Sequence, residues 1–226
     1  MNQESQITSY SKELEQVYAD TPEFLKGKIR HKALIVLFGL GNQGKTSTLF
    51  DLLFLLTSNS NQIKIHINKY FTKKNRKGQL CYKDGYFVLY YSDNPIFIST
   101  CGDGAAECER NKDFFERKPI SQPIYIIDGT RVLPLEKLSE EEQNAKYYNV
   151  PPQICVSACR TEGGSVDATM YMSKKFLSHI LQEVFIRKIG KKGGITESIY
   201  PDGPVITKDD HCLALDIKEY IDKMIK

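Results

Sequence analysis

The sequence predicts an α/β protein in which helices cover both faces of a mainly parallel sheet, as a three-layer sandwich. Short apolar runs, typical of buried strands, alternate along the chain with longer segments of helical periodicity. Such strands are normally joined by right-handed crossovers, which place the helices on the two faces of the sheet. The expected strands are 33–38, 63–67, 86–91, 95–100, 124–128 and 154–158.

Two of these regions need a separate argument. In 63–67, three isoleucines alternate with polar residues, which is the period of a half-exposed strand. Residues 92–95 have the sequence SDNP, a strong turn signal, between two strand-like runs. We therefore expect 86–91 and 95–100 to form an antiparallel hairpin after the first helix.

The expected helices differ in how they are recognised. The segment 46–57 is apolar almost all round, so it is expected to be buried on more than one side. The segment 173–189 has the clearest amphipathic pattern, followed by a glycine suited to ending a helix. Ser139 and Glu142 form a capping box that opens a short helix. The remaining expected helices are 104–118 and 215–225.

The chain is expected to fold around a single core. Its 226 residues suit one α/β domain with small additions. We assign 1–30 to an N-terminal helical extension, 31–190 to the core, and 191–226 to a C-terminal β-like segment and helix packed on that core.

Composition indicates where the protein is located in the cell but says little about its function. Lys and Arg total 31 against 28 Asp and Glu, so bulk charge favours no class of partner. The longest apolar stretch is too short to span a bilayer, and the first residues lack the pattern of a signal peptide. Six cysteines without a C-x-x-C motif are expected to be reduced, mostly buried thiols. These observations predict a cytoplasmic protein with no membrane segment.

The most informative stretch fits G-x-x-x-x-G-K-[ST], between an apolar strand and a long helix. Its glycines permit close approach of the backbone to an anion, and consecutive N–H groups then line a concavity. The following helix adds the positive end of its dipole. The residues are Gly39, Leu40, Gly41, Asn42, Gln43, Gly44, Lys45 and Thr46.

This stretch resembles the Walker A motif of the P-loop NTPase superfamily, and the resemblance covers some 25 residues well. It implies a P-loop type of fold that binds a nucleoside triphosphate and Mg²⁺ through the loop and Ser47. Lys45 would contact the β- and γ-phosphates and the Thr46 hydroxyl would ligate the metal. Leu40 stands where partition-type ATPases carry a second lysine, which argues against that subclass.

Acidic residues follow two of the expected strands. Ligands of parallel sheets bind at the carboxyl ends of the strands, which selects the residues just after 38, 100, 128 and 158. A magnesium site needs a carboxylate there. Both Asp103 and Asp128 fit as metal ligands and catalytic residues, and the glycine-flanked turn around Asp103 slightly favours it.

Basic residues supply two further candidates. Arg160 follows the strand 154–158 and is a candidate for stabilising charge on a transferred phosphoryl group. Five cations crowd 69–77 beside two aromatic residues, which suits either a nucleic-acid strand, a lid over the nucleotide or an ordinary solvated loop.

These features favour a small regulatory or switch-type ATPase that could work with a protein partner, and in which the γ-phosphate orders the loops after the strands. One alternative is a small-molecule or nucleotide kinase, in which Arg131, Arg160 and 69–77 would supply the arginines and the lid. The other is a nucleic-acid-associated protein in which ATP controls the binding of the nucleic acid. Guanine specificity is disfavoured because no N-K-x-D occurs, so ATP is the expected nucleotide.

Overall fold

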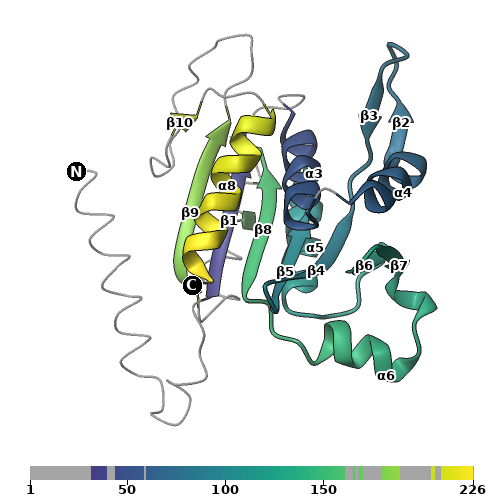
Figure 1. Ribbon diagram of the computed structural model, residues 1–226. Coiled ribbons are helices and arrows are strands. Elements are labelled where there is room, and N and C mark those ends of the chain that lie inside the picture. Colours follow the sequence, from purple (N-terminus) through teal and green to yellow (C-terminus); the bar gives the residue numbers. More distant parts are fainter. Residues whose placement is uncertain are drawn as a thin grey trace.

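A computed structural model shows a mixed α/β protein organised around one eight-stranded sheet (Figure 1). The structure describes residues 32–39, 44–58, 60–160, 165, 168–169, 180–188, 205–206 and 210–225. The expected N-terminal extension 1–30 and residues 191–204 lie outside these ranges. The order of strands across the sheet is β10-β9-β1-β8-β5-β4-β6-β7.

The strands have the following bounds. Those of the sheet are β1 (Lys32–Phe38), β4 (Tyr86–Tyr91), β5 (Asn94–Ser99), β6 (Ile124–Asp128), β7 (Arg131–Pro134), β8 (Ile154–Cys159), β9 (Ile180–Lys188) and β10 (Val205–Ile206). A separate two-stranded hairpin consists of β2 (Thr72–Lys74) and β3 (Leu80–Tyr82).

The helices lie between these strands along the chain, except for α8, which follows the last strand. They are α3 (Lys45–Leu56), α4 (Asn61–Phe71), α5 (Ala105–Phe115), α6 (Glu140–Gln143) and α8 (Asp210–Met224), with a 3₁₀ turn η1 (Leu135–Lys137) and a π-helical turn η2 (Asn144–Tyr148).

The sheet is mostly parallel, as predicted, but it contains a reversal that matters for the site. Strands β10, β9, β1, β8 and β5 are joined by parallel pairings. β4 then pairs with β5 in the antiparallel sense, which confirms the predicted hairpin. Because β6 is parallel to β4, it also runs opposite to β1.

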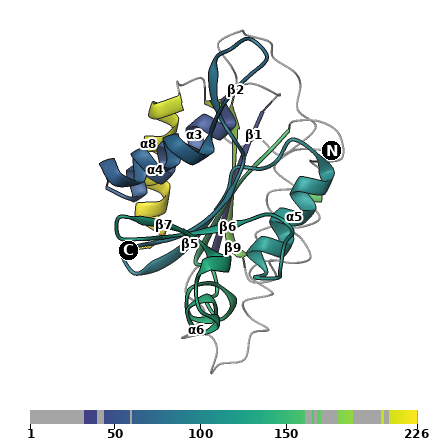
Figure 2. The same ribbon diagram turned by 90° about the vertical axis from the view of Figure 1, so that its right-hand side faces the viewer.

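Two hydrophobic clusters lie on opposite faces of the sheet. Ile35 and Leu37 of β1 pack with buried residues of α3, α4 and α8. Leu34 and Val36, which point the other way along the same strand, pack with residues of α5 and with Tyr147 of η2. Figure 2 shows α3, α4 and α8 on one side of the sheet and α5 on the other. A strand buried on both faces needs a continuous apolar run, and this is what β1 has.

Most of the local predictions are confirmed. The strands at 33–38, 124–128 and 154–158 and the helices at 46–57, 104–118 and 215–225 are all present within one to five residues of the predicted ends. α3 is buried on several sides, and Ser139 and Glu142 form the expected capping box. The five cysteines that the structure describes fully form no disulfide with one another, and four of them are buried.

The predicted strand at 63–67 is wrong, because this segment is the helix α4. Ser60 caps it by accepting a hydrogen bond from the Ile63 N–H group at 3.5 Å. Ile63 and Ile67 are fully buried while Ile65 is 68% exposed. Residues four apart share one face of a helix, so two of the three isoleucines satisfy a helical pattern that the alternation concealed.

The predicted helix at 173–189 is also corrected. Residues 180–188 form the strand β9, which pairs with β1 along its whole length, and 173–179 lie outside the described residues. β1 needs hydrogen-bond partners on both edges because it lies inside the sheet. A long-range pairing therefore overrode a local helical period, in a segment rich in β-branched and aromatic residues.

The C-terminal helix closes the fold on the face that carries α3. Ile217 and Ile221 of α8 are fully buried. The Tyr91 hydroxyl at the end of β4 donates a hydrogen bond to Asp222 at 2.8 Å. Among the helices in the described ranges, none combines the length and apolar character that a bilayer crossing requires.

Candidate functional site at the carboxyl edge of the sheet

The ends of three parallel strands and the start of an antiparallel strand meet at one edge of the sheet. The Gly39 N–H group, just after β1, donates to the Cys159 carbonyl at the end of β8 at 3.2 Å. Gly102, beyond β5, lies so close to β8 that a Cβ atom there would stand 1.9 Å from the Ala158 carbonyl oxygen. Glycine is therefore required at position 102 by a close approach of two backbones.

The glycine loop reaches this edge between β1 and α3. Gly44 adopts a left-handed conformation, with φ 81°, immediately before the first residue of α3. Lys45, Thr46 and Ser47 then form the first turn of the helix, where backbone N–H groups lack intrahelical partners. Leu40, Gly41, Asn42 and Gln43 lie outside the described residues.

Lys45 is a buried cation that points back across the loop. Its side chain is 5% exposed and its Nζ donates a hydrogen bond to the Gly39 carbonyl at 3.0 Å. Burial lowers the pKa of this ammonium group, and the nearby Asp103 carboxylate opposes that shift. The ammonium group thus lies beside the backbone at the carboxyl end of β1.

Asp103 brings two of the predicted cations together. Its Oδ1 lies 3.7 Å from Lys45 Nζ and 3.5 Å from Arg160 Nε. The side chains of Asp103 and Arg160 are 54% and 45% exposed, so the pair faces solvent above the buried lysine. Three of the four residues predicted to do chemistry are therefore assembled at one point.

Glu107, which the sequence analysis missed, holds the turn that carries Asp103. Its Oε2 accepts hydrogen bonds from the N–H groups of Gly102 at 3.0 Å and Asp103 at 2.7 Å. Glu107 lies in the first turn of α5, where a carboxylate is also favoured by the helix dipole. An acidic residue four positions after a glycine-flanked Asp was the available signal.

A second carboxylate, Asp84, was also missed. The Thr46 hydroxyl donates to Asp84 Oδ1 at 3.1 Å. Asp84 comes just before β4, whose reversed direction brings its first residues to this edge. Its neighbour Gly85 is fastened to the end of β5, since the Gly85 N–H group donates to Thr100 Oγ1 at 2.8 Å. The predicted hairpin therefore already implied this position.

The surroundings of Asp84 disfavour its ionised form. Desolvation by neighbouring protein atoms raises the pKa of this carboxyl to about 6, and the hydrogen bond from Thr46 opposes the shift. Two further carboxylates, Asp103 and Glu107, add to the increase. An excess of oxygen ligands over positive charge is the setting in which a divalent cation stabilises a carboxylate.

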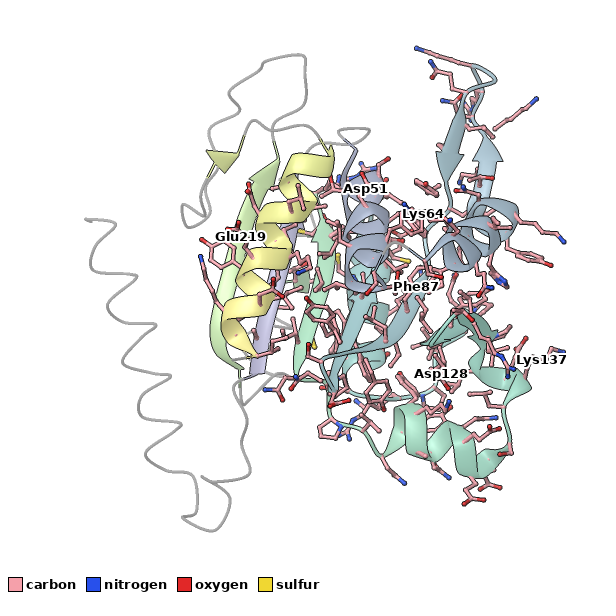
Figure 3. The ribbon with its side chains drawn as sticks, viewed as in Figure 1. Asp51, Lys64, Phe87, Asp128, Lys137 and Glu219 are labelled. Carbon is pink, nitrogen blue, oxygen red and sulfur yellow. The ribbon has the colours of Figure 1, made fainter. Side chains whose placement is uncertain are left out.

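Asp128 does not belong to this site, which corrects the prediction. It ends β6, and because β6 runs opposite to β1, the end of β6 lies at the other edge of the sheet. There Asp128 forms an ion pair with Lys146 of η2. Figure 3 shows Asp128 beside α6, away from the start of α3. Arg131 opposes Asp128 in the β6–β7 pairing and is likewise remote from Lys45.

The donor set at the carboxyl edge fits a magnesium ion better than a transition metal. It offers the Thr46 hydroxyl and carboxylate oxygens, and Mg²⁺ is held by one or two carboxylates together with waters and substrate phosphates. Among the described residues, no three His, Cys, Asp or Glu side chains gather to hold a metal by themselves.

Comparison with known proteins adds no family name. No family model matches the chain, and no curated protein or solved structure matches it either.

Proposed function

We propose that this protein binds a nucleoside triphosphate, in the first place ATP, together with Mg²⁺, and acts as a small regulatory or switch-type ATPase of the P-loop class. The site lies beside β1, where the order of strands turns from one side of the sheet to the other. Ligands of open α/β sheets bind at such switch points. The proposal takes Gly39 to Ser47 as the phosphate loop.

One observation carries the proposal. A buried ammonium group, Lys45, and a half-exposed guanidinium group, Arg160, converge on a single carboxylate directly above the first turn of α3. Two cations that share one small anionic group are suited to several phosphate oxygens. Asp103 occupies this position in the structure, and a triphosphate would compete with it for both cations.

This competition supports a switch. When phosphate oxygens take over Lys45 and Arg160, Asp103 loses both of its charged partners and the turn 101–104 is released from them. Hydrolysis would restore the original pairs. Two loops, 101–104 and the segment after β8, would thus respond to the γ-phosphate.

The metal would be held by Thr46 and Asp84, with Asp103 within reach of the same phosphates. When bound, Mg²⁺ would neutralise charge on the β- and γ-phosphates. The residues of the chain have separate tasks: Lys45 binds and orients the phosphates, Thr46 and Asp84 position oxygen atoms, and Arg160 stabilises charge on the transferred group.

The proposal is tested by a thermal-shift panel of nucleotides with and without Mg²⁺, followed by calorimetry on the best ligand. A specific ligand raises the melting temperature by mass action. We expect ATP with Mg²⁺ to give the largest shift, with slow hydrolysis in the protein alone. No shift with any triphosphate would overturn the proposal, and turnover that rises only with a small-molecule acceptor would assign the kinase instead.

A further inference from the structure

We propose that the basic hairpin, defined as residues 69–83, is a binding surface for single-stranded nucleic acid, and that Asp84 couples it to the triphosphate site. The proposed binding of nucleic acid does not depend on the function proposed above. The proposed coupling does, because it requires that a triphosphate binds at the carboxyl edge.

Charge is distributed very unevenly along the chain. Residues 52–83 contain seven Lys and Arg and no Asp or Glu. Subtracting these seven from the total of 31 leaves 24 cations against all 28 acidic residues. The net charge of +3 therefore conceals a strongly basic segment on a mildly acidic protein. Such a segment neutralises phosphates and releases their counterions.

The cations of the basic hairpin are exposed, and within the described part of the chain none of them takes part in an ion pair. Elsewhere, Lys118, Lys146 and Lys218 all pair with nearby carboxylates. Lys73 is close enough to Asp84 to oppose the rise in its pKa, but it forms no ion pair there, and the charge of the basic hairpin is available to a partner. Its six cations are Lys69, Lys73, Lys74, Arg76, Lys77 and Lys83.

The tip of the hairpin is an ordered turn held by side-chain hydrogen bonds. Asn75 Oδ1 accepts hydrogen bonds from the N–H groups of Lys77 at 2.9 Å and Gln79 at 3.0 Å. Gly78 takes the left-handed conformation that closes the turn, with φ 75°. Arg76 and Lys77 are thereby presented on a defined turn at the end of a projecting ribbon (Figure 1).

An aromatic side chain stands beside these cations. Tyr70 at the end of α4 is 51% exposed, and Lys69 Nζ lies 5.1 Å from its ring centroid. His66 packs against the same ring, with 4.6 Å between the centroids. Lys83 Nζ donates to the Tyr70 carbonyl at 3.2 Å, which brings the second strand to the same place. An exposed ring flanked by cations suits a stacked base whose phosphates are neutralised alongside.

This arrangement favours a nucleic-acid strand over an anionic membrane. A membrane surface would use the cations, but it would need a continuous apolar face. The exposed apolar residues here, Ile65 and Leu80, stand on different elements, and cations intervene between them in the sequence.

The base of the hairpin is fixed to the core and leads directly to the site. Tyr82 stacks on Phe50 of α3, with 4.2 Å between the ring centroids, and the Lys83 N–H group donates to the Phe71 carbonyl. The next residue is Asp84, which contacts Thr46. Tyr82, which is packed on the core, is thus only two positions from Asp84, the carboxylate proposed to hold the metal. A change in the position of the hairpin would therefore also affect Asp84.

The binding is tested with the whole chain and a fluorescently labelled single-stranded oligonucleotide, by anisotropy at several salt concentrations. We expect affinity to fall steeply as salt rises. The triple variant Lys74→Gln, Arg76→Gln, Lys77→Gln should lose at least tenfold in affinity and show a shallower salt dependence. The control variant Lys118→Gln, Lys137→Gln, Lys223→Gln removes the same charge elsewhere and should bind as the unchanged protein does.

A second pair of variants tests stacking. Tyr70→Ala should weaken binding about tenfold. Tyr90→Ala is the matched control, because Tyr90 is 43% exposed at the other end of β4 and should not matter. Equal affinity for the oligonucleotide in both triple variants, no binding at all, or preferential binding to phosphatidylserine vesicles would each overturn the nucleic-acid assignment.

Coupling is measured by adding a non-hydrolysable ATP analogue with Mg²⁺. We expect the oligonucleotide affinity to change in the unchanged protein and to stay constant in Asp84→Asn. Oligonucleotide binding that persists in Lys45→Ala but no longer responds to the analogue supports both proposals. If the analogue binds but leaves oligonucleotide affinity unaltered, the coupling is refuted while the proposed function stands. If the analogue does not bind at all, it is the proposed function that fails.

Discussion

The two edges of the sheet carry similar residue types but differ in what those residues can do. At the carboxyl edge of β1, Asp103 is shared by Lys45 and Arg160, above the first turn of a helix that follows a glycine loop. At the opposite edge, Asp128 pairs with one partner, Lys146, on a short helical turn. The first carboxylate is shared by two cations from different elements, and the second has a single ion-pair partner within the described part of the chain.

The direction of the strands explains this difference. Three parallel strands deliver their carboxyl ends, with glycine-rich turns and polar side chains, to the edge that contains Lys45. β6 runs the other way, so the acidic residue at its end lies at the opposite edge, away from the glycine loop. A pattern of four apolar residues followed by Asp identifies a strand end but not which edge that end reaches.

The largest expected difference concerns the two lysines. Lys45→Ala should reduce triphosphate affinity by roughly 10- to 100-fold, because a charge-assisted contact contributes about 1.5–3 kcal/mol. Calorimetry with ATP and Mg²⁺ measures this. Lys146→Ala, which removes the cation of the opposite edge, is the control and should bind ATP normally. A folded Lys45→Ala protein with unchanged affinity would show that the glycine loop is not a phosphate site.

The close approach at the carboxyl edge is tested by paired glycine substitutions. Gly102→Ala should destabilise the protein by about 1–3 kcal/mol, because the new Cβ atom collides with the β8 backbone. Gly104→Ala is the control, since no heavy atom lies within 4 Å of a Cβ atom there. Thermal and denaturant unfolding measure both. Equal stability of the two variants would contradict the packing of β5 against β8 described above.

The next largest effect is expected at Asp84, the carboxylate proposed to bind the metal together with Thr46. Asp84→Asn should weaken the Mg²⁺ dependence of triphosphate binding by about tenfold or more. It should not lower the melting temperature of the nucleotide-free protein, because desolvation raises the pKa of Asp84 to about 6, which means that its ionised form is less stable in the folded protein than in the unfolded chain. Magnesium titrations at fixed ATP, together with melting curves, report both quantities. An unaltered magnesium titration would remove Asp84 from the site.

The smallest effect is expected at the opposite edge. Asp128→Asn breaks an ion pair whose carboxylate side chain is 59% exposed, and such surface pairs contribute about 0–1 kcal/mol. Stability should therefore fall only slightly, and ATP turnover should match that of the unchanged protein. A large loss of turnover would show that this edge takes part in the chemistry after all.

The sequence predicted an element correctly where its local pattern fitted only one type of secondary structure. The prediction failed where the local pattern fitted both a helix and a strand. The isoleucines of 63–67 fit both a strand and a helix, and only the packing of Ile63 and Ile67 against the core chose the helix. Residues 180–188 have a helical period, but they became β9 because β1 had an edge to be paired. In both cases the deciding partner is distant in the sequence.

The residues of the candidate site also fall into two groups, those that the sequence predicted and those that it did not. Lys45, Thr46, Asp103 and Arg160 could be named from a motif and from strand ends, because each belongs to a recognisable local pattern. Asp84 and Glu107 had no motif of their own. Asp84 became visible only through the antiparallel direction of β4, and Glu107 only through its hydrogen bonds to the turn 102–103.

By itself, therefore, the sequence determined the strands of the core, the helix after the glycine loop and the position of one buried ammonium group. Each of these depends on residues within about a dozen positions of one another. The tertiary structure decided which carboxylates share an edge with that ammonium group, since strand direction is set by pairing between distant segments. The order and direction of the strands decide at which edge of the sheet each charged residue lies, and they depend on pairing that the local sequence pattern does not specify.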